Sequence, residues 1–215
     1  MGAGRLSVLK NIDLKINQSE ICSIVGPSGA GKSTLLNCIG CLDSFNSGSL
    51  KIHGKELSNM TIEDLSGFRN KKLGFIFQMH NLLPEFSALE NVMMPMLISR
   101  VSGKSARLRA REIIAEFGLS ERINHKPGEL SGGECQRIAV ARAIVNQPSI
   151  ILADEPTGSL DSENSSNLID ILFRLGKQMN TTIIIVTHDK TIAEKTERII
   201  SLKDGKIIED SAVIG

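Results

Sequence analysis

The stretch GPSGAGKST, at residues 26–34, restricts the fold of this chain more than any other part of the sequence. An apolar run, EICSIVG at 20–26, precedes it, and a helical pattern, KSTLLNCIGCL at 32–42, follows it. This order of strand, G-x-x-x-x-G-K-[ST] loop and helix is the context in which the loop binds nucleotide phosphates. An ordinary glycine-rich turn is the alternative, but such a turn needs neither the lysine nor the hydroxyl. The stretch therefore predicts a phosphate site in an α/β protein.

The chemistry of this loop suggests how its residues act. Glycines allow consecutive backbone N–H groups to turn inward toward phosphate oxygens, and the N-terminus of the following helix adds a favourable dipole. Lys32 is expected to reach the β and γ phosphates, and Ser33 to ligate Mg²⁺. The predicted nucleotide-binding residues of the loop are Gly26, Pro27, Ser28, Gly29, Ala30, Gly31, Lys32, Ser33 and Thr34.

Short β-rich runs alternate with longer helical patterns through much of the chain, which favours an α/β architecture. Three further apolar strands, each ending in polar residues, are predicted at 72–78, 149–155 and 181–189. Two hairpins are predicted at 48–57 and 198–210, with His53-Gly54 and Asp204-Gly205 at their turns.

The segment 79–145 has helical periodicity and no strand signal. One predicted helix, at 87–98, begins with a capping box at Ser87, and another, at 105–119, closes at Gly118. We therefore expect a single domain, 1–215, with an α/β nucleotide-binding core at 1–78 and 146–215 and a helical lobe at 79–145.

The predicted strands end in side chains suited to nucleotide hydrolysis. Asp154 would hold Mg²⁺, directly or through water, and Glu155 could accept a proton from an attacking water. Gln78 and His188 end two other strands, whose carboxyl ends share one rim if the sheet is parallel. Each residue also has a structural alternative. The two acids could form a solvated turn, Gln78 could be an ordinary polar residue at the end of a strand, and His188 could be a surface histidine. In company with the phosphate loop, the four residues favour one catalytic site.

A second glycine-rich helix start, LSGGECQR at 130–137, looks like a further phosphate-binding segment, and its residues 131–133 are called the second grip. Ser131 as N-cap and Glu134 at the third helical position form a capping box before an apolar stripe. This local interpretation needs no ligand, but it leaves Gly132 and Gly133 unexplained, which cost about 1 kcal/mol each relative to alanine. Glycine there lets a phosphate approach the exposed N–H groups. A nucleotide has only one set of phosphates, so the second grip needs an explanation.

Charge and composition exclude several classes of protein. The chain has 215 residues with 25 basic and 24 acidic side chains, so its net charge of +1 does not favour nucleic acid or an anionic membrane surface. No apolar run reaches the ~18 residues that a membrane-spanning helix needs, and the first residues lack the apolar stretch of a signal peptide. The four cysteines, which are too few for a disulfide scaffold and fit a reducing cytosol, are Cys22, Cys38, Cys41 and Cys135. Cys38 and Cys41 form a C-x-x-C pair, which we assign to packing ahead of metal or redox chemistry.

The motifs GPSGAGKST, LSGGECQ, SIILADEPTGSLD and VTHD together resemble the nucleotide-binding domain of the ATP-binding cassette (ABC) family, in the right order and over nearly the whole chain. KLGFIFQMHNLLPEFSALENVMMPML and NHKPGELSGGECQRIAVARAIVNQP are most similar to the lipoprotein-releasing members. The resemblance implies a P-loop NTPase with a RecA-like core, an antiparallel β subdomain and an inserted α-helical subdomain. It implies an ATPase that uses ATP and Mg²⁺ to drive lipoprotein release, attached peripherally to the cytoplasmic face of the bacterial inner membrane.

The resemblance also explains the second grip. Family members dimerise head to tail with ATP at the interface, so Ser131, Gly132 and Gly133 would hold the γ-phosphate bound by the partner's Lys32. The other implied roles are general base for Glu155, γ-phosphate contact for His188, Mg²⁺ link for Gln78 and dimer contact for Asp161. The helical lobe would receive a cytoplasmic helix of the transmembrane permease subunits. A groove there suits Met93, Met94 and Met96, although packing inside the lobe is an equal alternative.

Two features depart from the family pattern. The chain has no Tyr or Trp, and its first Phe is Phe45, so the adenine-stacking aromatic of an N-terminal strand before VLKNIDL is missing. We expect nucleotide binding weaker by roughly 1 to 3 kcal/mol, if adenine stacking resembles base stacking elsewhere. Cys135 replaces a charged or amide residue, and a low-pKa thiolate at the helix N-terminus is a minor alternative to an inert thiol.

Other functions are alternatives at this point. The nearest are the ATPases of macrolide-type efflux pumps and of the cell-division complex. A DNA-repair ABC ATPase would carry coiled coils or zinc modules between its phosphate motifs, and this interval has neither. A nucleotide-gated binding module without turnover is a third reading. One basic run is a candidate nucleic-acid patch, which we assign to a solvated helix face: Arg100, Lys104, Arg107, Arg109 and Arg111.

Overall fold

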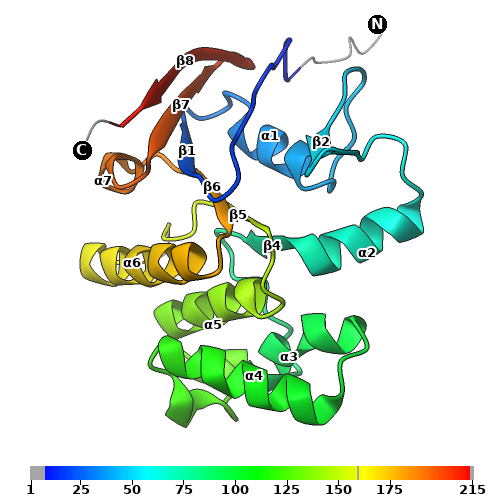
Figure 1. Ribbon diagram of the computed structural model, residues 1–215. Coiled ribbons are helices and arrows are strands. Elements are labelled where there is room, and N and C mark those ends of the chain that lie inside the picture. Colours follow the sequence, from blue (N-terminus) through cyan, green and yellow to red (C-terminus); the bar gives the residue numbers. More distant parts are fainter. Residues whose placement is uncertain (1–7, 159, 214–215) are drawn as a thin grey trace, which may run out of the picture.

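The computed structural model describes residues 8–158 and 160–213, and its strands form one large sheet and one small ribbon (Figure 1). The strands are β1 (Ile21–Val25), β2 (Lys51–Ile52), β3 (Lys55–Glu56), β4 (Leu73–Ile76), β5 (Ile150–Asp154), β6 (Thr182–Val186), β7 (Arg198–Lys203) and β8 (Lys206–Ala212). The large sheet has six strands in the order β4-β5-β6-β1-β7-β8, and β2 pairs with β3. All neighbours in the large sheet are parallel except β8, which runs antiparallel to β7.

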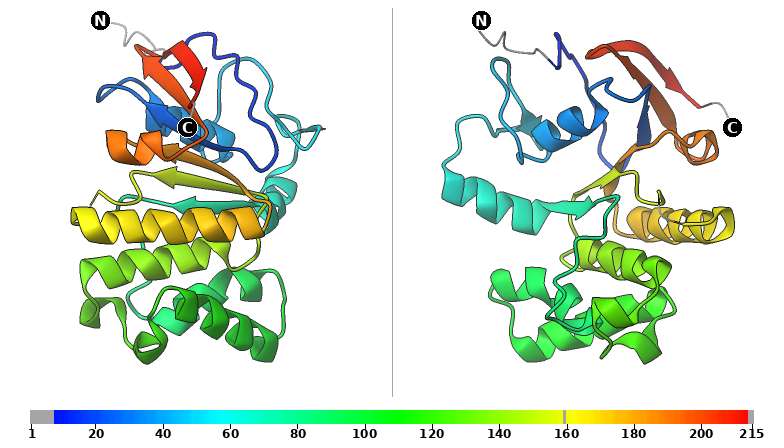
Figure 2. Two further views of the ribbon diagram at one scale, coloured as in Figure 1. Left: turned by 60° about the vertical axis from the view of Figure 1, so that its left-hand side comes forward. Right: turned by 180° about the vertical axis from the view of Figure 1, so that it is seen from behind.

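Helices cover both faces of the large sheet, and several of them form a layer farther from it (Figure 2). They are α1 (Lys32–Ile39), α2 (Ile62–Lys72), α3 (Ala88–Ile98), α4 (Gly103–Glu116), α5 (Gly132–Ile144), α6 (Ser162–Gln178) and α7 (Lys190–Glu194). Short 3-10 turns occupy Ser120–Arg122 and Pro127–Glu129. Within the described ranges, no helix has the length and apolar character needed to cross a membrane.

Two hydrophobic clusters, one on each face, hold the sheet between its helices. On β5, Ile151 and Ala153 enter the cluster that contains α5 and α6, whereas Leu152 enters the cluster that contains α1. Successive side chains of a strand point to opposite faces, so a central parallel strand must be apolar throughout. The strand β6, TIIIV, meets this requirement and is buried along its whole length.

The helices α3, α4 and α5 form the segment expected to be a helical lobe. One continuous cluster runs from Val92 of α3 through Ile138 of α5 to Ile151 of β5, so the helical layer and the sheet share a core. The division at 78 and 145 therefore stays a proposal, because packing does not separate the two parts.

The predicted strands and hairpins are present; the strands are shorter than their apolar runs, whereas the second hairpin extends beyond residue 210 because β8 ends at Ala212. Three helices were not predicted. These are α2, α6 and α7, and the first two carry readable signals. Thr61 caps α2 by accepting a hydrogen bond from the Asp64 N–H at 3.2 Å, and α6 buries Leu168, Leu172 and Leu175 at helical spacing. The helix predicted at 105–119 begins at Gly103, because Ser102 is its N-cap, and it ends at Glu116.

Candidate active site

The carboxyl ends of four parallel strands bring most of the predicted catalytic residues to one edge of the sheet. In chain order, β1 leads into the phosphate loop, β4 into Gln78, β5 into Glu155 and β6 into His188. The ladder continues past the strands, since the Glu155 N–H donates to the Val186 carbonyl at 2.9 Å and the Thr187 N–H to the Ile24 carbonyl at 3.2 Å. The rim expected from the sequence is therefore the observed arrangement.

The phosphate loop requires glycine at two positions. At Gly26 φ is +152°, and a Cβ there would lie 2.1 Å from the Leu202 carbonyl oxygen, which is a steric collision. Gly31 precedes α1 with φ +100°, a left-handed conformation that side chains disfavour, and no side chain caps the helix at this end. The first N–H groups of α1 thus remain available for an anion at the helix N-terminus.

Lys32 folds its ammonium back over the loop that precedes it. Its Nζ donates to the Gly26 carbonyl at 2.9 Å and to the Pro27 carbonyl at 3.1 Å. Ser28, Gly29 and Ser33 are exposed. A positive charge, a helix dipole and exposed loop N–H groups together fit the phosphates of a nucleotide.

Glu155 is held by the loop that follows β6. Its Oε1 lies 2.8 Å from His188 Nδ1, and its Oε2 accepts a hydrogen bond from the Thr187 hydroxyl at 3.4 Å. The Glu155 side chain is only 16% exposed, against 75% for His188. Its backbone has φ +47°, a strained conformation for a residue other than glycine. Thr187 was missed by the sequence analysis, although it belongs to the VTHD motif.

The predicted magnesium ligands are Ser33, Gln78 and Asp154, and the hydroxyl and the carboxylate have the oxygen chemistry that the ion prefers. Asp154 is half-buried at the end of β5, and its carboxylate has no hydrogen bond or ion pair with any residue in the described ranges. The same ranges contain no group of three or more His, Cys, Asp or Glu residues able to hold a metal. One carboxylate and one hydroxyl are nevertheless the usual protein share of a Mg²⁺ site that phosphates and water complete.

Gln78 lies against the turn that follows Glu155. A Cβ placed on Gly158 would approach Gln78 Nε2 to 3.1 Å, so the amide packs on this turn at van der Waals distance. Gln78 itself is exposed at the rim. The structure thus groups Gln78 with Glu155, as the strand order predicts.

The second glycine-rich start forms a complete cap at the N-terminus of α5. The Ser131 hydroxyl accepts a hydrogen bond from the Glu134 N–H at 3.2 Å, and Glu134 Oε2 accepts one from the Ser131 N–H at 2.8 Å. The bond from the Ser131 N–H, with the hydrogen bond from Arg122, lowers the pKa of Glu134. Ser131 and Gly132 are exposed, and within 8–158 and 160–213 no hydrogen bond connects residues 131–133 to loop 26–34.

Asp161, expected at a dimer contact, caps α6 in this chain. Its carboxylate accepts hydrogen bonds from the Asn164 N–H at 2.9 Å and from Asn164 Nδ2 at 2.7 Å. The bond from the Asn164 N–H is the main reason why the pKa of Asp161 is lowered. The contact role stays a prediction beside this structural one.

Burial decides between alternatives that the sequence left open at Cys135 and at the three methionines. Cys135 is buried, its thiol donates to the Pro127 carbonyl oxygen at 3.4 Å, and burial raises its pKa, which favours the inert thiol over the low-pKa thiolate. Met93 and Met96 are buried in the core, which leaves half-buried Met94 alone of the three methionines to border a groove. Burial also raises the pKa of Cys38 and of Cys41, as expected for packing residues.

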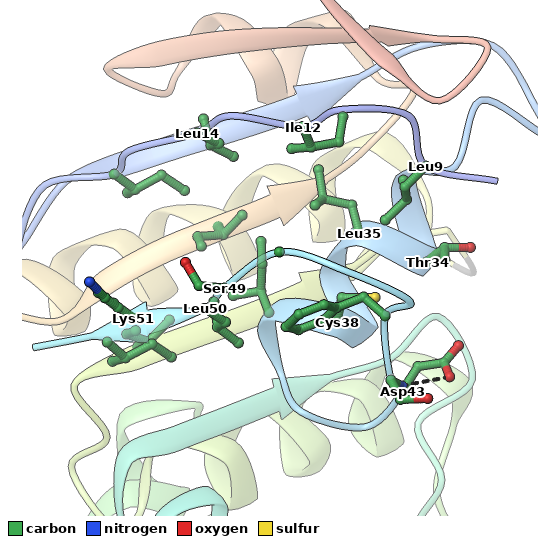
Figure 3. A pocket seen from close by; sticks show the side chains of 18 of the residues that line it. Leu9, Ile12, Leu14, Thr34, Leu35, Cys38, Asp43, Ser49, Leu50 and Lys51 are labelled. Carbon is green, nitrogen blue, oxygen red and sulfur yellow. Dashed lines mark hydrogen bonds between the residues drawn. The ribbon is translucent and has the colours of Figure 1, made fainter. Parts of the chain in front are cut away.

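A cavity of about 1060 Å³ lies between α1, the N-terminal segment and the loop before β2 (Figure 3). It is lined by the N-terminal segment with Leu9, Ile12 and Leu14, by Leu35 and Cys38 of α1, and by the loop before β2. Of the predicted phosphate-loop residues, Thr34 alone borders it. The cavity therefore adjoins the candidate active site through Thr34 and contains none of the predicted catalytic residues.

The fold and this rim define a nucleotide-binding domain of the ATP-binding cassette type. The sequence model described as ABC transporter matches residues 9–158, and the chain belongs to this family. It is 57% identical over 205 residues, 95% of both chains, to the lipoprotein-releasing system ATP-binding protein LolD of Bacteroides fragilis (strain YCH46). It is 53% identical over 207 residues, 96% of this chain and 94% of the relative, to LolD of Porphyromonas gingivalis (strain ATCC BAA-308 / W83).

A solved structure has the same fold. The ATP-binding cassette MJ0796, in a dimeric post-hydrolysis state bound to ADP and Pi, matches with a TM-score of 0.93 at 42% identity, covering 100% of this chain and 94% of that chain. The fold class, the family and the similarity to lipoprotein-releasing members that the motifs predicted are thereby confirmed. No comparison tests the individual site residues, whose roles stay predictions.

Proposed function

We propose that the chain is the ATP-hydrolysing subunit of a membrane ABC transporter, in which closing and reopening of an ATP-bound dimer powers the release of lipoproteins from the inner membrane. The relatives at 53–57% identity, named lipoprotein-releasing system ATP-binding proteins, support the cargo. The observation that carries the enzymatic part is the Glu155 carboxylate, fixed by His188 and Thr187 at the strand end beside the phosphate loop. ATPases of macrolide-type pumps and of the cell-division complex share this machinery and are the alternatives.

In the proposed reaction, loop 26–34 and the N-terminus of α1 bind the phosphates, and Lys32 turns from the two carbonyls toward the β and γ phosphates. Glu155 accepts a proton from the water that attacks the γ-phosphorus, as a carboxylate with lone pairs beyond its two hydrogen bonds can do. The bond between the γ-phosphorus and the bridging oxygen breaks, which yields ADP and phosphate. His188 leaves Glu155 to contact the γ-phosphate. Asp154, Ser33 and Gln78 would hold magnesium, which supplies charge neutralisation at the phosphate oxygens.

The proposed active unit is a head-to-tail homodimer. Within one chain, residues 131–133 have no hydrogen bond to loop 26–34 among the residues described, so the second grip is free to serve another copy. The solved relative is itself described as dimeric. A two-fold arrangement of two chains lets each exposed α5 N-terminus complete the site of the other copy.

The proposed membrane partners are the transmembrane permease subunits, which would hold this chain at the cytoplasmic face of the bacterial inner membrane. Exposed apolar side chains follow Gln78 on the segment leading to α3: Met79, Leu83 and Phe86. Such a group, next to the catalytic rim, suits the helix of a permease. A net charge of +1 gives no support to a nucleic-acid partner.

Reconstitution with the permease subunits in lipoprotein-loaded vesicles tests this function. The expected result is ATP-dependent lipoprotein release that the Glu155→Gln variant does not support, although the variant still assembles with the permease. Release that is equally fast with Glu155→Gln, or an assembled complex that turns over ATP without releasing lipoprotein, would contradict the corresponding part of the proposal.

A further inference from the structure

A buried amide, Gln136, connects the helix of the second grip to both loops of the catalytic rim. It lies in the second turn of α5, just after the Ser131 cap, and is 1% exposed. Its Nε2 donates to the Phe77 carbonyl at 3.0 Å and to the Pro156 carbonyl at 2.8 Å. The first carbonyl directly precedes Gln78, and the second directly follows Glu155. One side-chain nitrogen therefore fixes the backbone next to two predicted catalytic residues.

The same helix holds the far side of the Gln78 segment. Arg142 donates from one terminal nitrogen to the Asn81 carbonyl at 2.7 Å and from the other to the His80 carbonyl at 2.8 Å. With the bond to Phe77, α5 binds carbonyls on both sides of Gln78. The Gln78 segment is thus attached to α5 at three points, and a displacement of α5 would carry it along.

The amide of Gln136 has only one orientation that fits these contacts. Carbonyl oxygens can only accept, so both N–H bonds of Nε2 must point at Phe77 and Pro156. The remaining Oε1 is buried and has no hydrogen-bond partner among the described residues. An unpaired buried acceptor lowers stability. The two bonds of Nε2 thus hold both loops at once, while the amide oxygen has no partner among the described residues.

We infer that Gln136 is a positioning residue, which sets Gln78 and Glu155 relative to the N-terminus of α5 and so connects the two ATP sites of the dimer. The inference rests on the proposed function, because it takes Gln78 and Glu155 as working residues. When residues 131–133 engage the nucleotide of the other copy, α5 settles in one position. Gln136 transmits that position to the two loops of its own chain's site.

The test is Gln136→Met, which keeps the volume but removes both donors. Its matched control is Thr181→Val, which removes a buried bond of 2.8 Å to the Pro148 carbonyl at the opposite edge of the sheet. We expect Gln136→Met to lower kcat ~10- to 100-fold, the scale of a small misplacement of reacting groups. The Kd for ATP, measured on the monomer, should stay within about twofold, because loop 26–34 is untouched. Thr181→Val should keep kcat despite a loss of stability.

A second variant covers the case in which the methionine variant does not fold. Gln136→Glu, as a carboxylic acid, donates to one carbonyl, and as a carboxylate it repels both. Its kcat should therefore fall as pH rises through the ionisation of that group, over a range where wild type is flat and both proteins stay folded. A purely structural residue predicts no such profile.

The possible outcomes separate this inference from the proposed function. A folded Gln136→Met with wild-type kcat, or a Gln136→Glu pH profile like that of wild type, would overturn the inference alone. A wild-type chain without ATPase activity, or a Glu155→Gln variant with full activity, would overturn the proposed function. Loss of kcat in Gln136→Met with ATP binding and fold intact supports the positioning role.

Discussion

Replacing Glu155 with glutamine removes the proposed proton acceptor while keeping its shape. The side chain is 16% exposed, and the amide can retain both contacts. Its oxygen can accept from His188, and its nitrogen can donate to the Thr187 hydroxyl oxygen. We therefore expect the free energy of unfolding to change by less than about 1 kcal/mol.

The expected loss is in the rate of hydrolysis. A positioned general base contributes ~10²- to 10⁴-fold, which corresponds to about 2.7 to 5.4 kcal/mol in the activation free energy at 1.36 kcal/mol per decade. Since binding of ATP is retained, saturating Mg-ATP should also hold the variant as a dimer, because the step that separates the chains is blocked.

The assay compares steady-state phosphate release and light scattering under saturating Mg-ATP for wild type, Glu155→Gln and a surface control. Glu116→Gln is the control, since its carboxylate forms an exposed ion pair with Arg174 at 3.1 Å and such pairs contribute little. The reasoning is refuted if Glu155→Gln keeps a rate within about threefold of wild type, or if Glu116→Gln loses as much.

Three further predictions concern the loop, the ligand and the sheet. Gly26→Ala should lower the free energy of unfolding by ~2 to 4 kcal/mol in urea titrations, because its Cβ would collide with the Leu202 carbonyl. Gly29→Ala should lower it by about 1 kcal/mol, because a Cβ there meets open space. Equal losses in the two variants would contradict the steric argument. Lys32→Ala should abolish ATP binding in calorimetry, and unchanged binding would contradict the assignment of loop 26–34 as the phosphate site. In the folded chain, the hydrogen bond from Arg198 lowers the pKa of Asp210. At pH values above the pKa that this carboxyl has in the unfolded chain, the carboxylate therefore stabilises the fold. This stabilisation is lost as pH falls through the lowered pKa of the folded chain. Asp210→Asn should therefore reduce stability at neutral pH, and the difference from wild type should disappear as pH falls below the unfolded value of about 3.9 and through the lowered folded pKa. A difference independent of pH would contradict this prediction.

The strands and the catalytic rim could be read from the sequence because they depend on local patterns. Apolar runs followed by polar residues fixed β1, β4, β5 and β6, and parallel pairing then placed their ends together. The glycines of 26–34 were readable because only glycine meets the backbone demands of that turn, as the contact of Gly26 with Leu202 illustrates.

Contacts made across the chain could not be read in this way. Gln136 and Arg142 look like polar residues on an amphipathic helix, yet their donors reach carbonyls about sixty residues earlier, at Phe77 and His80. No local period encodes which carbonyl a buried donor will meet. The caps of α2 and α6, by contrast, are local signals at Thr61 and Asp161, although Asp161 also carries the dimer-contact role that the family resemblance implies.

Purified mixed dimers test most directly whether each ATP site is built from two chains. One copy carries Lys32→Ala and the other Ser131→Arg, a bulky change at the exposed α5 N-terminus. If the sites are shared, both defects fall in one site and the other is intact, so the mixed dimer should hydrolyse ATP while neither parent homodimer does. A mixed dimer of wild type with the double variant should then be inactive, because each site carries one defect. Activity in that second dimer and none in the first would contradict the account, since it would place loop 26–34 and residues 131–133 of the same chain around one nucleotide.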